Sequence, residues 1–276
     1  MKNFLVILIL LCAALKPALA SGTTPKSSGL RANRIQFSYV PPKNPDHQAI
    51  YAEMKKREVL ERFKEFLSPL RLPRPLRLKI AGCNGDANAF YDDDVVTVCY
   101  EYIDEIVRSA PLKTTPAGVT RMDAIAGPIV EVFFHEIAHA LFDYYDLPVL
   151  GREEDAADFV AAYILLQFGK KDARRLIAGV AYTYGREALQ PSTKKNPFAD
   201  EHDLPAQRFY NVLCLAYGAD PKLFGDVVNA GYLPKERAEG CDDEFKQVKR
   251  AMDKLVKPYT DQAIARKVRS KRWLRF

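Results

Sequence analysis

The sequence predicts a helix-dominated α+β fold, with a small β-sheet or hairpin upstream of the main helices. Two short runs, residues 77–81 and 95–100, are bounded by proline, glycine and aspartate turn signals and are typical of strands. From residue 129 onward, apolar residues recur mostly at helical spacing. The chain has 276 residues and no internal repeat, so we expect one main domain with a single core.

The N-terminus is typical of a signal peptide. Lys2 supplies a positive charge, residues 4–14 are apolar, and Ala18-Leu19-Ala20 is a small-residue cleavage site. The apolar run is too short to span a bilayer as a helix. We therefore expect cleavage after Ala20 and a secreted or periplasmic protein.

The rest of the chain divides by composition. Residues 21–45 are rich in serine, glycine, proline and lysine, which predicts a flexible lead-in. Residues 46–257 form the expected domain, which begins with a charged amphipathic helix over 47–67. Residues 258–276 form a basic C-terminal tail that we expect to be solvated and frayed, or to contact an anionic envelope surface weakly. Nucleic acid is not an expected partner, since the chain has a signal peptide and no nucleic-acid motif.

The predicted strands enclose an acidic turn. Asp92-Asp93-Asp94 precedes residues 95–100, and the pattern predicts a hairpin. We expect residues 95–100 to be an edge strand, where an extended peptide could add by main-chain hydrogen bonds, although the same strand could instead be internal.

The most specific motif is His135-Glu136-Ile137-Ala138-His139, which matches the H-E-x-x-H pattern of zinc peptidases. It lies in a predicted helix over 129–147, with Pro128 at the first helical position. Histidines four residues apart lie on one helix face, so both imidazoles can reach one Zn²⁺ ion. Glu136 can then hold a water and act as general base.

A catalytic zinc site needs a third protein ligand, and the next predicted helix, over 152–168, begins with acidic residues. We assign Glu154 to the metal. Asp158, one turn further on, would accept a hydrogen bond from a ligating histidine. Asp155 and Asp158 remain rival ligands, whereas Arg152 and Glu153 are expected to be solvated first-turn charges.

A separate donor should stabilise the developing oxyanion. His202, which precedes a predicted helix over 206–217, is our candidate; Arg208 and Tyr210 are alternatives, and Tyr182 and Tyr184 are weaker ones. Further helices are expected over 172–182, 221–229 and 242–256.

Removal of Cys12 with the signal peptide leaves an even number of cysteines, which predicts disulfides in an exported protein. Three pairings are possible, of which we favour Cys83 with Cys99 and Cys214 with Cys241. A cysteine-based zinc site is the alternative, but no paired C-x-x-C spacing supports it.

Four blocks together, HEIAHALFD, GREEDAADFVAAY, HDLPAQRFYN and the upstream CNGDANAFYDDDVVTVCYE, resemble a bacterial family of predicted metallopeptidases over roughly residues 44–257. The resemblance implies a zincin-like catalytic domain and names no substrate. A looser likeness is to thermolysin-type zincins, in which a glutamate ligand is followed four residues later by an aspartate that orients a zinc histidine. Only fourteen residues separate His139 from Glu154, fewer than is usual in that group, which leaves the third ligand open.

These patterns predict a zinc-dependent hydrolase that cleaves peptides or proteins of unknown identity. A non-catalytic zinc or scaffold domain of the cell envelope is the competing class, but such a site does not need Glu136 and usually has four protein ligands. A zinc amidase acting on non-peptide amides would use the same residues. Oligomeric state does not follow from the sequence.

Overall fold

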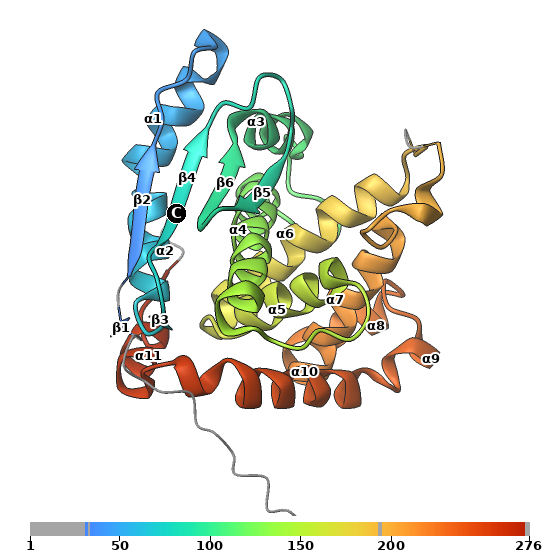
Figure 1. Cartoon of the computed structure of the whole chain (residues 1–276). Coiled ribbons are helices and arrows are strands. Elements are labelled where there is room, and N and C mark those ends of the chain that lie inside the picture. Colours follow the sequence, from blue (N-terminus) through green and yellow to red (C-terminus); the bar gives the residue numbers. More distant parts are fainter. Residues whose placement is uncertain (1–30, 33, 193–194, 274–276) are drawn as a thin grey trace, which may run out of the picture.

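The computed structural model describes residues 31–32, 34–192 and 195–273 (Figure 1). It confirms a helix-dominated α+β fold with a small sheet upstream of the long helices. The signal peptide predicted over 1–20 lies outside the described residues.

The sheet is mixed, and its four strands run in the order β2-β4-β6-β5. The first three are parallel, and β5 is antiparallel to β6. A separate two-stranded pair joins β1 to β3. The bounds are β1 Arg31–Ala32, β2 Ile35–Tyr39, β3 Arg71–Leu72, β4 Leu76–Ala81, β5 Ala89–Asp92 and β6 Val95–Cys99.

Two predictions about the N-terminal region are wrong. Part of the expected lead-in over 21–45 is strand β2, because Ile35 is buried in the core and its strand pairs along the whole of β4. The helix expected over 47–67 is broken into α1 (Gln48–Lys56) and α2 (Val59–Leu67). Glu58 adopts a left-handed conformation (φ 53°) at the break, which redirects the chain and seats both helices against the sheet side of the core.

The β5–β6 hairpin is present as predicted. Asp93 and Asp94 form its two-residue turn, and both have positive φ (46° and 64°), as a type I′ turn requires. The favoured edge position for residues 95–100 is wrong and the alternative, an internal strand, is confirmed, since β6 lies between β4 and β5. Among the described strands, the edge of the sheet nearest the long helix α4 is β5.

The remaining helices follow the sheet, and most match the predicted segments. Their bounds are α3 Tyr100–Ser109, α4 Arg121–Tyr145, α5 Glu153–Leu165, α6 Lys170–Ala188, α7 Pro205–Ala219, α8 Pro221–Asn229, α9 Lys235–Ala238, α10 Cys241–Leu255 and α11 Gln262–Arg269.

Helix α4 begins eight residues earlier than predicted, so Pro128 lies inside the helix and not at its first position. Thr120 and Asp123 form a reciprocal capping box that satisfies free N–H groups at the true start. Arg175 of α6 donates to Asp123 at 2.7 Å and ties this start to the core. These contacts outweigh the hydrogen bond that Pro128 removes.

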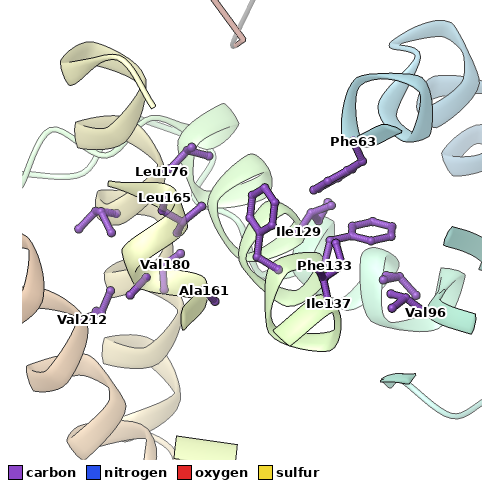
Figure 2. Close-up of a cluster of buried hydrophobic side chains, with 14 of the residues drawn as sticks. Phe63, Val96, Ile129, Phe133, Ile137, Ala161, Leu165, Leu176, Val180 and Val212 are labelled. Carbon is purple, nitrogen blue, oxygen red and sulfur yellow. The ribbon is translucent and has the colours of Figure 1, made fainter. Parts of the chain in front are cut away.

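Helix α4 is the centre of the molecule. Figure 1 shows the sheet on one side of it and α5, α6 and α7 on the other. In Figure 2, Phe133 and Ile137 lie on the side of α4 that faces Phe63 and Val96. Leu165 lies on the other side of α4, among the later helices. Although α4 is long and apolar enough to cross a membrane, two thirds of its apolar window (67%) is buried inside the protein, as in a core helix.

The C-terminal end is more ordered than the tail predicted over 258–276. Helix α11 packs near α2, and Trp273 is buried with its indole N–H donating to the carbonyl of Val268. Both predicted disulfides are formed: Cys83 with Cys99 and Cys214 with Cys241. A disulfide has no thiolate to offer zinc, so the structure does not support a cysteine-based site here.

Helices α4 and α6 cross where each has a glycine. A Cβ on Gly179 would lie 1.9 Å from the carbonyl oxygen of Asp123, which is backbone and cannot move aside cheaply. We therefore expect Gly179→Ala to lower the free energy of unfolding by about 1–3 kcal/mol or more, despite the better helix propensity of alanine. Urea unfolding followed by circular dichroism would measure the change.

Gly225 of α8 provides the matched control, because a Cβ there would meet no atom within 4 Å. We expect Gly225→Ala to be neutral or to stabilise by up to about 1 kcal/mol. Equal effects of the two substitutions would contradict the close helix packing described above.

Candidate metal centre

Two histidines of α4 face one cavity. His135 and His139 are one turn apart, as the motif predicts, and their Nε2 atoms are 3.2 Å from each other. His135 is 4% exposed, because α4 is buried around it. The cavity has a volume of about 590 Å³ and is lined by both rings and by Glu136.

Glu154 at the start of α5 completes this cluster. Its Oε2 is 2.9 Å from Nε2 of His135 and 3.4 Å from Nε2 of His139. Alanines 157, 161 and 162 on α5 are buried and let this helix approach α4 closely. The rival ligand Asp155 instead pairs with Arg152 at 2.6 Å.

Each histidine is oriented by a second carboxylate. Nδ1 of His135 is 2.9 Å from Asp158, which is the contact predicted for that aspartate. Nδ1 of His139 is 2.7 Å from Glu153, which the sequence had suggested was only a solvated charge. Carboxylates at these positions fix the tautomer and ring orientation so that both Nε2 atoms point into the cluster.

Asp158 is itself held by Arg208 of α7, whose guanidinium donates to both carboxylate oxygens at 2.6 and 2.5 Å. Arg208 thus serves as a buried partner of Asp158, although its side chain also reaches the cavity wall. Burial raises the pKa of Asp158, but the charges of Arg208 and His135 outweigh it and lower that pKa to about 2. The carboxylate is therefore ionised at neutral pH.

Glu131 was not singled out from the sequence, yet it belongs to the same network. It lies one turn before His135 on α4, is buried, and accepts a hydrogen bond from Tyr184 at 2.8 Å. Burial raises its pKa, while the charge of Arg208, whose Nη2 is 3.9 Å away, opposes that shift. An acid four residues before a motif histidine, and therefore on the same helix face, was the available signal in the sequence.

His202 lies beside the cluster, as predicted. Its Nε2 is 2.8 Å from Oε2 of Glu154, and its ring stacks on that of His135 with centroids 5.7 Å apart. His202, His135 and Glu154 each place one candidate ligand atom within 4.8 Å of the others. Of the other suggested donors, Tyr184 lines the cavity, whereas Tyr182 and Tyr210 do not.

Glu136 differs from the other carboxylates of the site. It is 7% exposed and lines the cavity, and among the described residues it makes no side-chain hydrogen bond or ion pair of its own. Burial raises its pKa, while the neighbouring histidines oppose the shift. A desolvated carboxyl with raised proton affinity is suited to take a proton from water.

Hydrogen bonds within the cluster shift the pKa values of its members. Burial lowers the pKa of His135, but hydrogen bonds to Asp158 and Glu154 outweigh it and raise that pKa to about 10. Hydrogen bonds from His135, His139 and His202 hold the pKa of Glu154 far below its usual range. Glu154 is therefore ionised. His135 and His139, whose pKa values are raised, could each release a proton when a cation binds.

The donor set fits a tetrahedral divalent ion. Ligand atoms about 2.1 Å from such an ion lie roughly 3.4 Å from each other. The three separations among His135, His139 and Glu154 are 3.2, 3.4 and 2.9 Å. Two imidazoles with one carboxylate are a common zinc set, and each histidine has its orienting carboxylate in place.

The edge strand β5 forms one wall of the cavity. Residues 87–91 line it opposite the helices, and among the described residues β5 pairs with β6 alone. An extended chain could therefore reach the cluster along a free strand edge.

A model of the protein family described as "Putative metallopeptidase" matches residues 39–256. The match covers most of the chain, including every residue of the cluster. No curated protein and no solved structure matches the chain.

The buried Asp158–Arg208 pair generates a prediction. Arg208→Gln would leave Asp158 and Glu131 without their shared cation, and we expect it to lower the free energy of unfolding by about 3 kcal/mol. Arg108→Gln is the control, because Arg108 forms an exposed pair with Asp104 and should contribute little. Urea unfolding of both variants measures the difference, and equal stabilities would refute the role given to Arg208.

Proposed function

The chain belongs to this metallopeptidase family, and on that premise we propose that it is an exported zinc-dependent peptidase. The observation that carries the proposal is the convergence of His135, His139 and Glu154 around one point in the cavity that Glu136 also lines. Zinc held by these three residues would supply Lewis-acid polarisation of a scissile carbonyl and lower the pKa of a water toward neutrality.

Proton transfer, stabilisation of the developing oxyanion and orientation of the ligands are assigned to residues of the chain. Glu136 accepts a proton from the attacking water and delivers it to the leaving amine. His202 donates a hydrogen bond to the carbonyl oxygen as negative charge develops there. Asp158 and Glu153 hold the two ligating rings in place, and Arg208 keeps Asp158 ionised.

The substrate that fits this cavity is an extended peptide. Residues of β5 form one wall, and their free edge offers main-chain donors and acceptors to a chain lying antiparallel or parallel to the strand. This mode positions the peptide backbone with little dependence on the side chains of the peptide.

Export rests on two features. The segment over 1–20 has the composition of a cleavable signal, and the two disulfides favour an oxidising compartment. We therefore propose that the enzyme acts outside the cytoplasm, as a secreted or periplasmic protein.

Metal content tests the ligand set. We expect about one zinc per wild-type chain, retained in Glu136→Gln and Asp155→Ala and lost in His139→Ala and Glu154→Ala. Inductively coupled plasma mass spectrometry on the purified, zinc-replete proteins gives the stoichiometry. Retention of zinc in Glu154→Ala together with loss in Asp155→Ala would exchange the two assignments.

Glu136→Gln tests catalysis separately from binding. Because the amide cannot take a proton, we expect peptide cleavage to fall at least about 100-fold while zinc stays bound. A quenched fluorescent peptide library measures the rate. Unchanged cleavage by this variant would rule out Glu136 as the base.

One observation favours a second candidate function. His202 contacts Glu154 as closely as the motif histidines do, so it could act as a fourth protein ligand. Four protein ligands would close the site and make it a structural zinc centre of a non-catalytic domain.

His202→Gln separates the two functions. If His202 is an oxyanion donor, the variant keeps its zinc and loses about 100- to 1,000-fold in turnover. If it is a fourth ligand, zinc affinity falls in a chelator competition and no peptidase activity exists to lose.

A further inference from the structure

A second cavity lies on the other side of α4. It has a volume of about 630 Å³ and is lined by residues of α1, α2, α3 and α4, together with Phe168 and Trp273. None of its described lining residues also lines the cavity of the metal centre. Ile125, Ile129 and Phe134 of α4 face it, whereas Glu131, His135 and His139 face the metal centre.

The interior of this second cavity is apolar. Met54, Phe63, Ile103, Ile129 and Phe134 form its buried wall, and the side chain of Phe63 points toward Ile129 in Figure 2. Its volume and apolar lining lie within the range of small-molecule sites. Apolar surface in a hollow of this size favours an apolar guest over water.

The rim, in contrast, is basic. Among the described residues, the cavity is lined by the cations Lys56, Arg57, Arg62 and Arg121 and by one acid, Glu53. That acid is already shared, since it pairs with Arg57 at 2.6 Å and with Lys56 at 3.9 Å. An excess of cations around an apolar interior selects for a guest with an anionic end.

Arg62 and Arg121 are the cations best placed to receive that end. Arg62 donates to the carbonyls of Arg57 and Trp273, and Arg121 donates to those of Val107 and Ala110. Within the described residues, neither guanidinium has a carboxylate within salt-bridge distance. The carbonyls fix the positions of both groups without neutralising their charge, and each guanidinium keeps unused donors.

We propose that this cavity binds a single-chain anionic amphiphile, such as a long-chain carboxylate. The alkyl chain fills the apolar interior between α2 and α4, and the carboxylate pairs with Arg62 or Arg121 at the rim. The site is independent of the proposed peptidase activity, because it uses none of the residues assigned to the metal centre.

The protein carries its own probe for this test. Trp273 is the single tryptophan of the chain, lines the cavity and packs against Phe66 with ring centroids 5.3 Å apart. Titration with oleate should change its fluorescence saturably with one site per chain, and a doxyl-labelled stearate should quench it. Oleyl alcohol and dodecylamine should bind at least about tenfold more weakly, because they lack the negative charge.

Substitutions test which residues bind the carboxylate and where the alkyl chain lies. By calorimetry, we expect the double variant Arg62→Gln with Arg121→Gln to bind oleate at least about tenfold more weakly, and the single variants to show which arginine dominates. Arg250→Gln, at an exposed position on α10 away from the cavity, should bind as wild type does. Ala126→Phe should abolish binding by filling the cavity, with Ala49→Phe at its exposed mouth as a second blocking variant.

Several outcomes would overturn the proposal. These are the absence of saturable oleate binding, equal binding of the alcohol, or wild-type binding by the double arginine variant. Binding that appears only with phospholipid vesicles would indicate a membrane surface instead of a single-chain guest. A concentration-dependent dimer in sedimentation that oleate does not affect would indicate that a second copy of the chain covers the cavity.

Discussion

The close packing of α4 against α5 and α6 is the constraint on which the rest of the structure depends. Facing glycines, Gly127 and Gly179, let α4 and α6 approach until their backbones touch, and the alanine-rich face of α5 closes the other flank. This packing brings Glu154 and Asp158 of α5 to the histidines of α4. A larger residue at either glycine would therefore disturb the core and the metal centre together.

Burial of so many charged groups costs desolvation free energy, which hydrogen bonds and ion pairs among the buried groups offset. His135, Asp158 and Arg208 form a continuous chain of hydrogen bonds, and Glu131 with Tyr184 lies beside it. Each buried charge meets an opposite charge or a donor, as buried polar groups require. Within the described part of this network, Glu136 makes no side-chain hydrogen bond or ion pair, which suits the general-base role proposed for it.

Helix α4 also separates the two cavities, one polar and one apolar. Its polar face carries the motif, and its apolar face lines the hollow beneath α1 and α2. The helix can serve both because different faces of its 25 residues, between the capping box at Thr120 and the left-handed Asp146, line the two cavities. A guest in the apolar cavity would contact the same helix that positions the proposed zinc ligands.

The sequence by itself determined the features that depend on local spacing. Histidines four residues apart predicted the motif face, and the tight acidic turn predicted the β5–β6 hairpin. An even number of cysteines predicted that there are two disulfides. Each of these features follows from backbone periodicity or simple pairing. Most of the later helices were also evident from apolar periodicity. The resemblance of four sequence blocks to a metallopeptidase family implied a catalytic domain but did not indicate its substrate.

Only the tertiary structure decided the features that depend on contacts distant in sequence. Strand β2 looked like a lead-in because its burial comes from pairing with β4, and the start of α4 was hidden because Asp123 is secured by Arg175. Glu153 contacts His139 for the same reason, because α5 packs closely on α4 through small residues. These three features depend on packing between segments distant in the sequence, and a local sequence pattern carries no information about such packing.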